Sequence, residues 1–128
     1  MYKVLLVDDE RLELNTLKNY VDWNKMGIGT VYTANNGLQA LETAQYKKPD
    51  IVFTDIRMPV MDGIEFARQL REKDKRVKII FLTGYDEMDF IRQAFRLSAT
   101  DYILKPFLVE DIEPVSYTHL RAHETRGN

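Results

Sequence analysis

The sequence contains no cysteine, which excludes disulfide bonds and thiolate metal sites. Its only two histidines, His119 and His123, are a weak signal for a metal site on their own. Neither sign of charge dominates, because 18 basic and 20 acidic residues give a net charge of -2, so we expect no DNA binding by this chain. No apolar run approaches the about 20 residues of a membrane-spanning helix, and no secretory signal follows Met1. We therefore expect a cytoplasmic protein without membrane contact.

Short apolar runs rich in β-branched residues recur along the chain and are typical of buried parallel strands. Stretches with the three- and four-residue apolar spacing of amphipathic helices separate them. This repeated β-α order predicts an α/β domain, a doubly wound parallel sheet with helices on both faces. The expected strands lie at residues 4–7, 31–34, 51–53, 79–82 and 102–104, and the expected helices at residues 10–21, 38–44, 62–70 and 86–96.

The end of the chain breaks this pattern. A fifth helix is expected to start near Val109, but Pro114 removes a backbone donor and would clash inside a helix. No apolar stripe that would dock on the sheet follows it, and the last residues resemble translated adaptor or vector sequence. We therefore predict a domain over residues 1–113, a fifth helix truncated near Ile112, and a non-native or disordered tail over residues 114–128.

Polar side chains follow four of the strands at the point where each strand ends. Asp8 and Asp9 follow the first, Asp55 the third, Thr83 the fourth and Lys105 the fifth. In open parallel sheets, ligands bind in the crevice at the carboxyl ends of the strands, so these side chains should lie together. Three close carboxylates repel one another, and a hard divalent cation removes the conflict. Oxygen ligands without histidine or cysteine indicate Mg²⁺.

This set of side chains also fits phosphoryl chemistry. A carboxylate beside Mg²⁺ can attack phosphorus and form an acyl phosphate. Lys105 would neutralise phosphoryl oxygens during transfer, and Thr83 would donate a hydrogen bond to one of them. Each residue also has an ordinary structural explanation, such as Asp8 acting as a helix N-cap. Because those explanations would have to hold independently at four strand ends, we favour the functional interpretation.

The same residues carry a resemblance to a known family. From residue 2 to about residue 112, the chain resembles the receiver domain of two-component response regulators. The resemblance implies a flavodoxin-like fold with strand order 2-1-3-4-5. The motifs that carry it are Val7-Asp8-Asp9-Glu10, Thr54-Asp55-Ile56-Arg57-Met58-Pro59-Val60-Met61-Asp62-Gly63, Leu82-Thr83-Gly84-Tyr85 and Asp101-Tyr102-Ile103-Leu104-Lys105-Pro106-Phe107.

The resemblance assigns a role to each site residue. It implies that Asp55 is the phosphorylation site and that Lys105 pairs with the phosphoryl group. It further implies that Thr83 supplies the switch hydroxyl and that Tyr102 is an aromatic switch. The Mg²⁺ ligands would be Asp9 and Asp55 directly, the backbone carbonyl of Arg57, and Asp8 through a water molecule.

Partners follow from the same resemblance. A sensor histidine kinase would donate the phosphoryl group, and the surface of the fourth helix, fifth strand and fifth helix would then change and could form a homodimer. Val21-Asp22-Trp23, Met26-Gly27 and Leu82-Thr83-Gly84-Tyr85-Asp86 resemble regulators with an AraC-type DNA-binding output domain. DNA binding and transcription control are then expected of the full-length protein. The chain itself would be a signalling domain, catalysing only its own phosphorylation and dephosphorylation.

Three alternatives remain open. A phosphatase with an aspartyl nucleophile, of the haloacid-dehalogenase-like kind, would carry Asp-x-Asp-x-Thr after its first strand, where this chain has Asp8-Asp9-Glu10. A flavin- or nucleotide-binding module would need a phosphate loop rich in glycine or hydroxyls at that place. A phosphorylation-independent pseudo-receiver would signal by protein contact alone, and the complete set of acidic, threonine and lysine residues argues against it.

Overall fold

The computed structural model describes residues 1–89, 91, 92 and 99–127. Five parallel strands form one sheet in the order β2-β1-β3-β4-β5, which confirms the predicted topology. Each predicted strand is present, and β2 begins three residues earlier than its weak apolar pattern indicated. The strands are β1 (Tyr2–Val7), β2 (Ile28–Ala34), β3 (Ile51–Asp55), β4 (Lys78–Thr83) and β5 (Asp101–Leu104).

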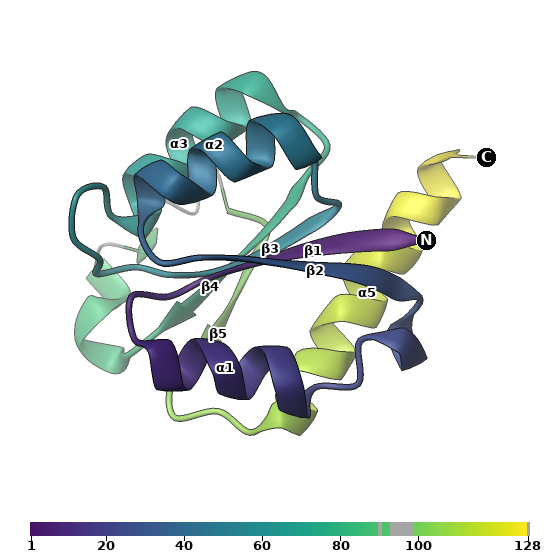
Figure 1. The fold of residues 1–128 in the computed structure, drawn as a ribbon, viewed down its shortest axis with the longest axis horizontal. Coiled ribbons are helices and arrows are strands. Elements are labelled where there is room, and N and C mark those ends of the chain that lie inside the picture. Colours follow the sequence, from purple (N-terminus) through teal and green to yellow (C-terminus); the bar gives the residue numbers. More distant parts are fainter. Residues whose placement is uncertain (90, 93–98, 128) are drawn as a thin grey trace.

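Helices cover both faces of the sheet, as the doubly wound prediction requires (Figure 1). On one face, Leu5 and Val7 of β1 pack with α2 (Gly37–Lys47) and α3 (Gly63–Lys73). On the other face, Val4 and Leu6 pack with α1 (Arg11–Tyr20) and α5 (Val109–Gly127). Because successive strand residues point to opposite faces, continuously apolar strands bury both sides and leave function to the strand ends.

The connection from β3 to α3 is held tightly against the end of β3. Asp62 is the N-cap of α3, and its side chain accepts a hydrogen bond of 2.8 Å from the backbone N–H of Glu65. The N–H of Gly63 donates to the carbonyl oxygen of Ile56 at 2.7 Å. A Cβ atom at Gly63 would lie 2.0 Å from the carbonyl oxygen of Asp55, so only glycine fits. These contacts fix the backbone at the residue predicted to be phosphorylated.

The helix predicted over residues 86–96 falls partly on residues outside the described part of the chain, namely residue 90 and residues 93–96. Its first two residues, Asp86 and Glu87, lie instead in a short 3-10 turn, η2 (Tyr85–Glu87), directly after β4. A second 3-10 turn, η1 (Asn24–Met26), joins α1 to β2. No helix within the described ranges is both long and apolar enough to cross a membrane.

The prediction of a truncated fifth helix is wrong. Helix α5 continues to Gly127, and Ile112, Ser116 and Leu120 line up at four-residue spacing on its buried side. Ser116 hid this stripe in the sequence, but its hydroxyl donates to the carbonyl oxygen of Ile112 at 2.8 Å, which allows it to be buried. Pro114 is exposed on the opposite side. Residues 114–127 are therefore helical rather than disordered, while their non-native origin stays a prediction.

This packing predicts that Leu120→Ala lowers the free energy of unfolding by about 2–4 kcal/mol, because a nearly fully buried leucine leaves a cavity. Urea unfolding followed by circular dichroism measures the change. The control is Leu108→Ala, which truncates an exposed leucine and should change stability by less than about 0.5 kcal/mol. Equal stability of the two variants would mean that the end of α5 does not pack.

Candidate functional site

The carboxyl ends of four strands bring the predicted site residues together. Asp8 follows β1, Asp55 ends β3, Thr83 ends β4 and Lys105 follows β5. The strand register holds them in place, because Asp55 pairs with Leu82 of β4. The backbone N–H of Lys105 also donates to the carbonyl oxygen of Thr83 at 2.6 Å. The crevice at this edge is therefore set by the backbone of the sheet.

Asp8, Asp9 and Asp55, here called the acidic cluster, each offer an oxygen, and these oxygens lie within 4.8 Å of one another. Asp8 and Asp55 are buried, whereas Asp9 is exposed. One oxygen of Asp8, Oδ1, accepts a hydrogen bond of 2.9 Å from the backbone N–H of Glu10. The other, Oδ2, is buried without a hydrogen-bond partner among the described residues. Buried oxygens are rarely left unpaired, so this one fits the oxygen-rich shell of a hard cation.

The electrostatics of the acidic cluster agree with this fit. Burial raises the pKa of Asp8 to about 7, and the neighbouring carboxylates of Glu13 and Asp55 add to the rise. Burial also raises the pKa of Asp55, although the hydrogen bond from Lys105 opposes the change. Without a cation, the folded chain therefore resists ionisation of Asp8 and Asp55.

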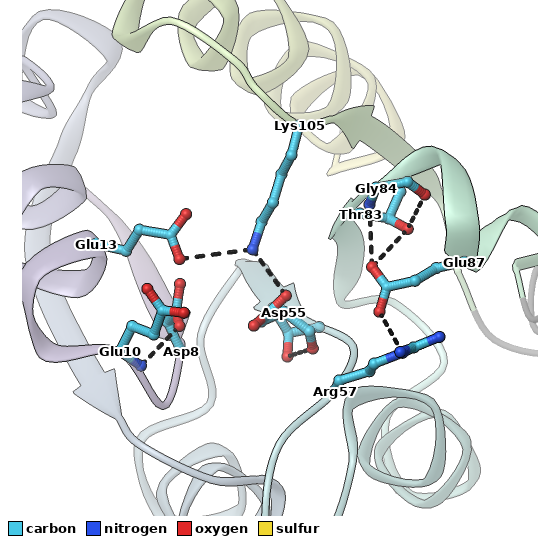
Figure 2. Close-up of polar contacts among 10 residues, drawn as sticks. Asp8, Glu10, Glu13, Asp55, Arg57, Thr83, Gly84, Glu87 and Lys105 are labelled. Carbon is cyan, nitrogen blue, oxygen red and sulfur yellow. Dashed lines mark hydrogen bonds and ion pairs between the residues drawn. The ribbon is translucent and has the colours of Figure 1, made fainter.

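Lys105 supplies the one positive charge placed between these carboxylates in Figure 2. Its Nζ lies 3.0 Å from Oδ1 of Asp55 and 3.5 Å from Oε2 of Glu13. Burial alone would lower the pKa of Lys105, but the hydrogen bond and charge of Asp55 outweigh it and leave the pKa raised. The lysine thus stays charged beside the carboxylate that is predicted to react. Glu13 was not predicted as a site residue, because in the sequence it looks like any acidic residue early in a helix.

Thr83 is buried, and its hydroxyl lies 3.3 Å from Oε1 of Glu87. Arg57 leaves the end of β3, and its Nε lies 3.2 Å from Oε2 of the same Glu87 (Figure 2). Sequence reasoning missed Glu87, which looked like an ordinary acid in the first turn of a helix. The one available signal was its position three residues after Gly84, the spacing of a helix capping box.

Two residues remain to be placed: Tyr102, which is predicted to be a switch, and His119, which is only a weak signal for a metal site. Tyr102 pairs with Phe81 within the sheet, but its side chain is exposed, so its role as a switch stays a prediction. His119 lies on α5 with Nε2 3.0 Å from Oδ2 of Asp101. Within the part of the chain that the structure describes, the acidic cluster is the one group of three or more metal-ligating side chains.

The burial of Asp8, together with the repulsion from its neighbouring carboxylates, predicts the effect of Asp8→Asn. The folded pKa near 7 exceeds the ordinary value of 3.8, so ionisation of Asp8 lowers stability as the pH rises from about 4 to about 7. Asparagine removes that loss and keeps an acceptor for the N–H of Glu10. We expect the variant to gain about 1–3 kcal/mol in unfolding free energy at pH 8 in the presence of a chelator.

Urea unfolding at pH 8 and pH 5 measures this effect, and the difference between variant and parent should shrink at pH 5. The matched control is Asp50→Asn, which removes a carboxylate at the opposite end of β3. A variant less stable than the parent at pH 8 would contradict the account of repulsion at Asp8.

Comparison with known proteins supports the same assignment. The family model for the response regulator receiver domain matches residues 4–115. The transcriptional regulatory protein YesN of Bacillus subtilis is 37% identical over 106 residues, which cover 83% of this chain and 29% of YesN. HptR of Staphylococcus aureus is 35% identical over 106 residues, covering 83% of this chain and 41% of HptR. The chain thus spans well under half the length of these relatives.

Solved structures agree with the sequence comparison. The receiver domain of AraT, a response regulator from Geobacillus stearothermophilus, has a TM-score of 0.91 and 34% identity, covering 99% of this chain and 98% of that one. A two-component transcriptional regulator AraC from Clostridium phytofermentans has a TM-score of 0.88 and 27% identity, covering 94% of each chain. The predicted resemblance is confirmed, and the chain belongs to the receiver domains of two-component response regulators.

Proposed function

We propose that Asp55 accepts a phosphoryl group from a phosphohistidine of a sensor histidine kinase. The observation that carries this proposal is the position of the Asp55 carboxylate. It lies 3.0 Å from the Lys105 ammonium and within 4.8 Å of ligand oxygens from Asp8 and Asp9. A nucleophile, a positive charge and a set of hard ligands meet in one crevice at the carboxyl edge of the sheet.

Phosphoryl transfer from the phosphohistidine to Asp55 needs no further reactant. A carboxylate oxygen of Asp55 forms a bond to phosphorus while the bond between phosphorus and the histidine nitrogen breaks. The electron pair of that bond stays with the imidazole, and the product is an acyl phosphate on Asp55. Lys105 keeps its contact near the reacting carboxylate and neutralises charge on the phosphoryl oxygens. Hydrolysis of the acyl phosphate returns the chain to its starting state, so its chemistry serves signalling rather than turnover of a substrate.

The acidic cluster would hold Mg²⁺ for this chemistry. Asp9, Asp55 and the backbone carbonyl of Arg57 would be direct ligands, and Asp8 would bind through water. When bound, the cation supplies positive charge that offsets the repulsion of the carboxylates and of the incoming phosphoryl oxygens. The buried Oδ2 of Asp8, which has no hydrogen-bond partner among the described residues, supports this ligand set.

Phosphorylation would act as an electrostatic switch. The phosphoryl group adds about -1.5 to -2 charge near neutral pH and three strong acceptor oxygens. Thr83 would move toward them, and Tyr102, now exposed on β5, would turn into the space that Thr83 leaves. The surface of the fourth helix, β5 and α5 would change with it and could pair with a second copy.

The names of the relatives support a role in transcription. YesN and HptR are named transcriptional regulatory proteins, and the matched part is 29% and 41% of their lengths. We infer that the full-length protein carries a DNA-binding output domain and that this chain binds no DNA itself. We also keep the proposal that the native receiver sequence covers residues 1–113 and that residues 114–128, which continue α5, are of non-native origin. The family match, which ends at residue 115, supports that boundary.

Intact mass after incubation with acetyl phosphate and Mg²⁺ tests the proposal. The parent should gain the mass of one phosphoryl group, because the Asp55 carboxylate is placed to attack phosphorus. Asp55→Ala, which lacks the nucleophile, should gain none, and a chelator should abolish the gain in the parent.

Other outcomes would identify the alternatives. A folded parent that gains no mass would favour a phosphorylation-independent pseudo-receiver. Sustained release of phosphate from a phosphomonoester such as p-nitrophenyl phosphate would favour an aspartyl phosphatase. Circular dichroism of the parent and of Asp55→Ala shows whether each is folded, so that a misfolded variant is not mistaken for an inactive one.

A further inference from the structure

A single carboxylate occupies two hydrogen-bond donors at the end of β4. Oε1 of Glu87 lies 3.3 Å from the hydroxyl of Thr83 and accepts a hydrogen bond of 3.0 Å from the backbone N–H of Gly84. The Thr83 hydroxyl also lies 3.2 Å from the carbonyl oxygen of Gly84. Figure 2 shows the Glu87 side chain turned back over this strand end.

Arg57 holds the other oxygen of the same carboxylate. The Nε of Arg57 lies 3.2 Å from Oε2 of Glu87, a residue that is only 7% exposed. The Nη2 of Arg57 lies 3.9 Å from Oδ2 of Asp86, which is exposed. Both oxygens of Glu87 are thus engaged, which makes burial of its charge tolerable. Because Arg57 follows Asp55 by two residues, the ion pair joins the loop after β3 to the turn after β4. We call Arg57, Thr83, Gly84 and Glu87 the Glu87 network.

The hydroxyl of Thr83 and the backbone N–H of Gly84 lie on the strand next to Asp55, where they could donate to an anion on its carboxylate. Asp55 pairs with Leu82 in the register of β3 and β4, so Thr83 and Gly84 follow immediately on the neighbouring strand. The N–H and O–H groups at this strand end face an internal carboxylate before any phosphoryl group is present. A charged acceptor forms stronger hydrogen bonds than a neutral one. Releasing these donors from Glu87 therefore costs free energy.

We propose that Glu87 is a positioning residue that competes with the phosphoryl group of Asp55 for Thr83 and Gly84. The inference rests on the proposed phosphorylation of Asp55 and deepens it. When the phosphoryl group arrives, its oxygens take the hydroxyl of Thr83 and the N–H of Gly84, and Glu87 gives them up. Phosphorylation must therefore displace Glu87, and the displacement moves the turn after β4.

A purely structural role accounts for only part of the network. A glutamate that reaches back three residues to a backbone N–H is half of a capping box, which stabilises the start of a helix. That motif explains the contact with Gly84. It explains neither the contact with the buried Thr83 hydroxyl nor the ion pair with Arg57. Glutamine serves in a capping box as well as glutamate does, so Glu87→Gln keeps the cap and removes the charge.

The test measures the affinity of the full chain for beryllofluoride, an anion that mimics the phosphoryl group on an aspartate, in the presence of Mg²⁺. Glu87→Gln should bind it about three- to tenfold more tightly than the parent, because a neutral acceptor competes less well for the same donors. The matched control is Asp86→Asn, which removes one negative charge beside Arg57 and leaves the carboxylate of Glu87 in place, and its affinity should equal that of the parent.

Each result decides the matter. Equal affinity of Glu87→Gln and the parent would overturn the proposal and leave Glu87 as a helix cap alone. An equal gain in Asp86→Asn would also overturn it, because the effect would then come from net charge. If neither the parent nor any variant bound beryllofluoride or accepted a phosphoryl group, the proposed function itself would fail. The proposed competition of Glu87 for Thr83 and Gly84 would then fail as well. Thermal unfolding shows whether each variant keeps the fold of the parent.

Discussion

Carboxylates buried together at the carboxyl edge of the sheet dominate the energetics of this domain, because burial and mutual repulsion both oppose their ionisation. Two of the three acids in the acidic cluster are buried, and an oxygen of Asp8 lacks a partner among the described residues. A single ammonium group, on Lys105, lies between Asp55 and Glu13. Such a site gives up stability in its resting state. Under the proposed function, the same charges would attract a cation and then a phosphoryl group.

The sequence predicted well which side chains gather at this edge, because each of them follows a strand with a clear apolar run. Parallel pairing then places Asp8, Asp55, Thr83 and Lys105 at one edge without any knowledge of side-chain conformation. The sequence failed where a polar residue plays a buried role. Ser116 interrupts the apolar stripe of α5 and is nonetheless buried, because its hydroxyl bonds to the preceding turn of the helix. Sequence patterns count such a serine as exposed.

Glu87 was missed for a related reason. Its sequence neighbours are acidic and polar, so it looked like one of several solvated acids at the start of a helix. Only the folded chain shows that the ends of β3 and β4 bring Arg57 and Thr83 to it. The Glu87 network joins the loop that follows Asp55 to the turn after β4, and we propose that a charge added at Asp55 would move that turn.

The dependence of stability on Mg²⁺ tests the central claim most directly. The measurement compares the thermal unfolding midpoint in magnesium chloride with that in sodium chloride of equal ionic strength, for the parent and for Asp9→Asn. Asp9 is exposed, so its substitution should leave the metal-free fold intact. The account predicts that Mg²⁺ raises the midpoint of the parent, and raises that of Asp9→Asn much less, because the cation binds the folded state alone. A parent midpoint that is the same in both salts would contradict it.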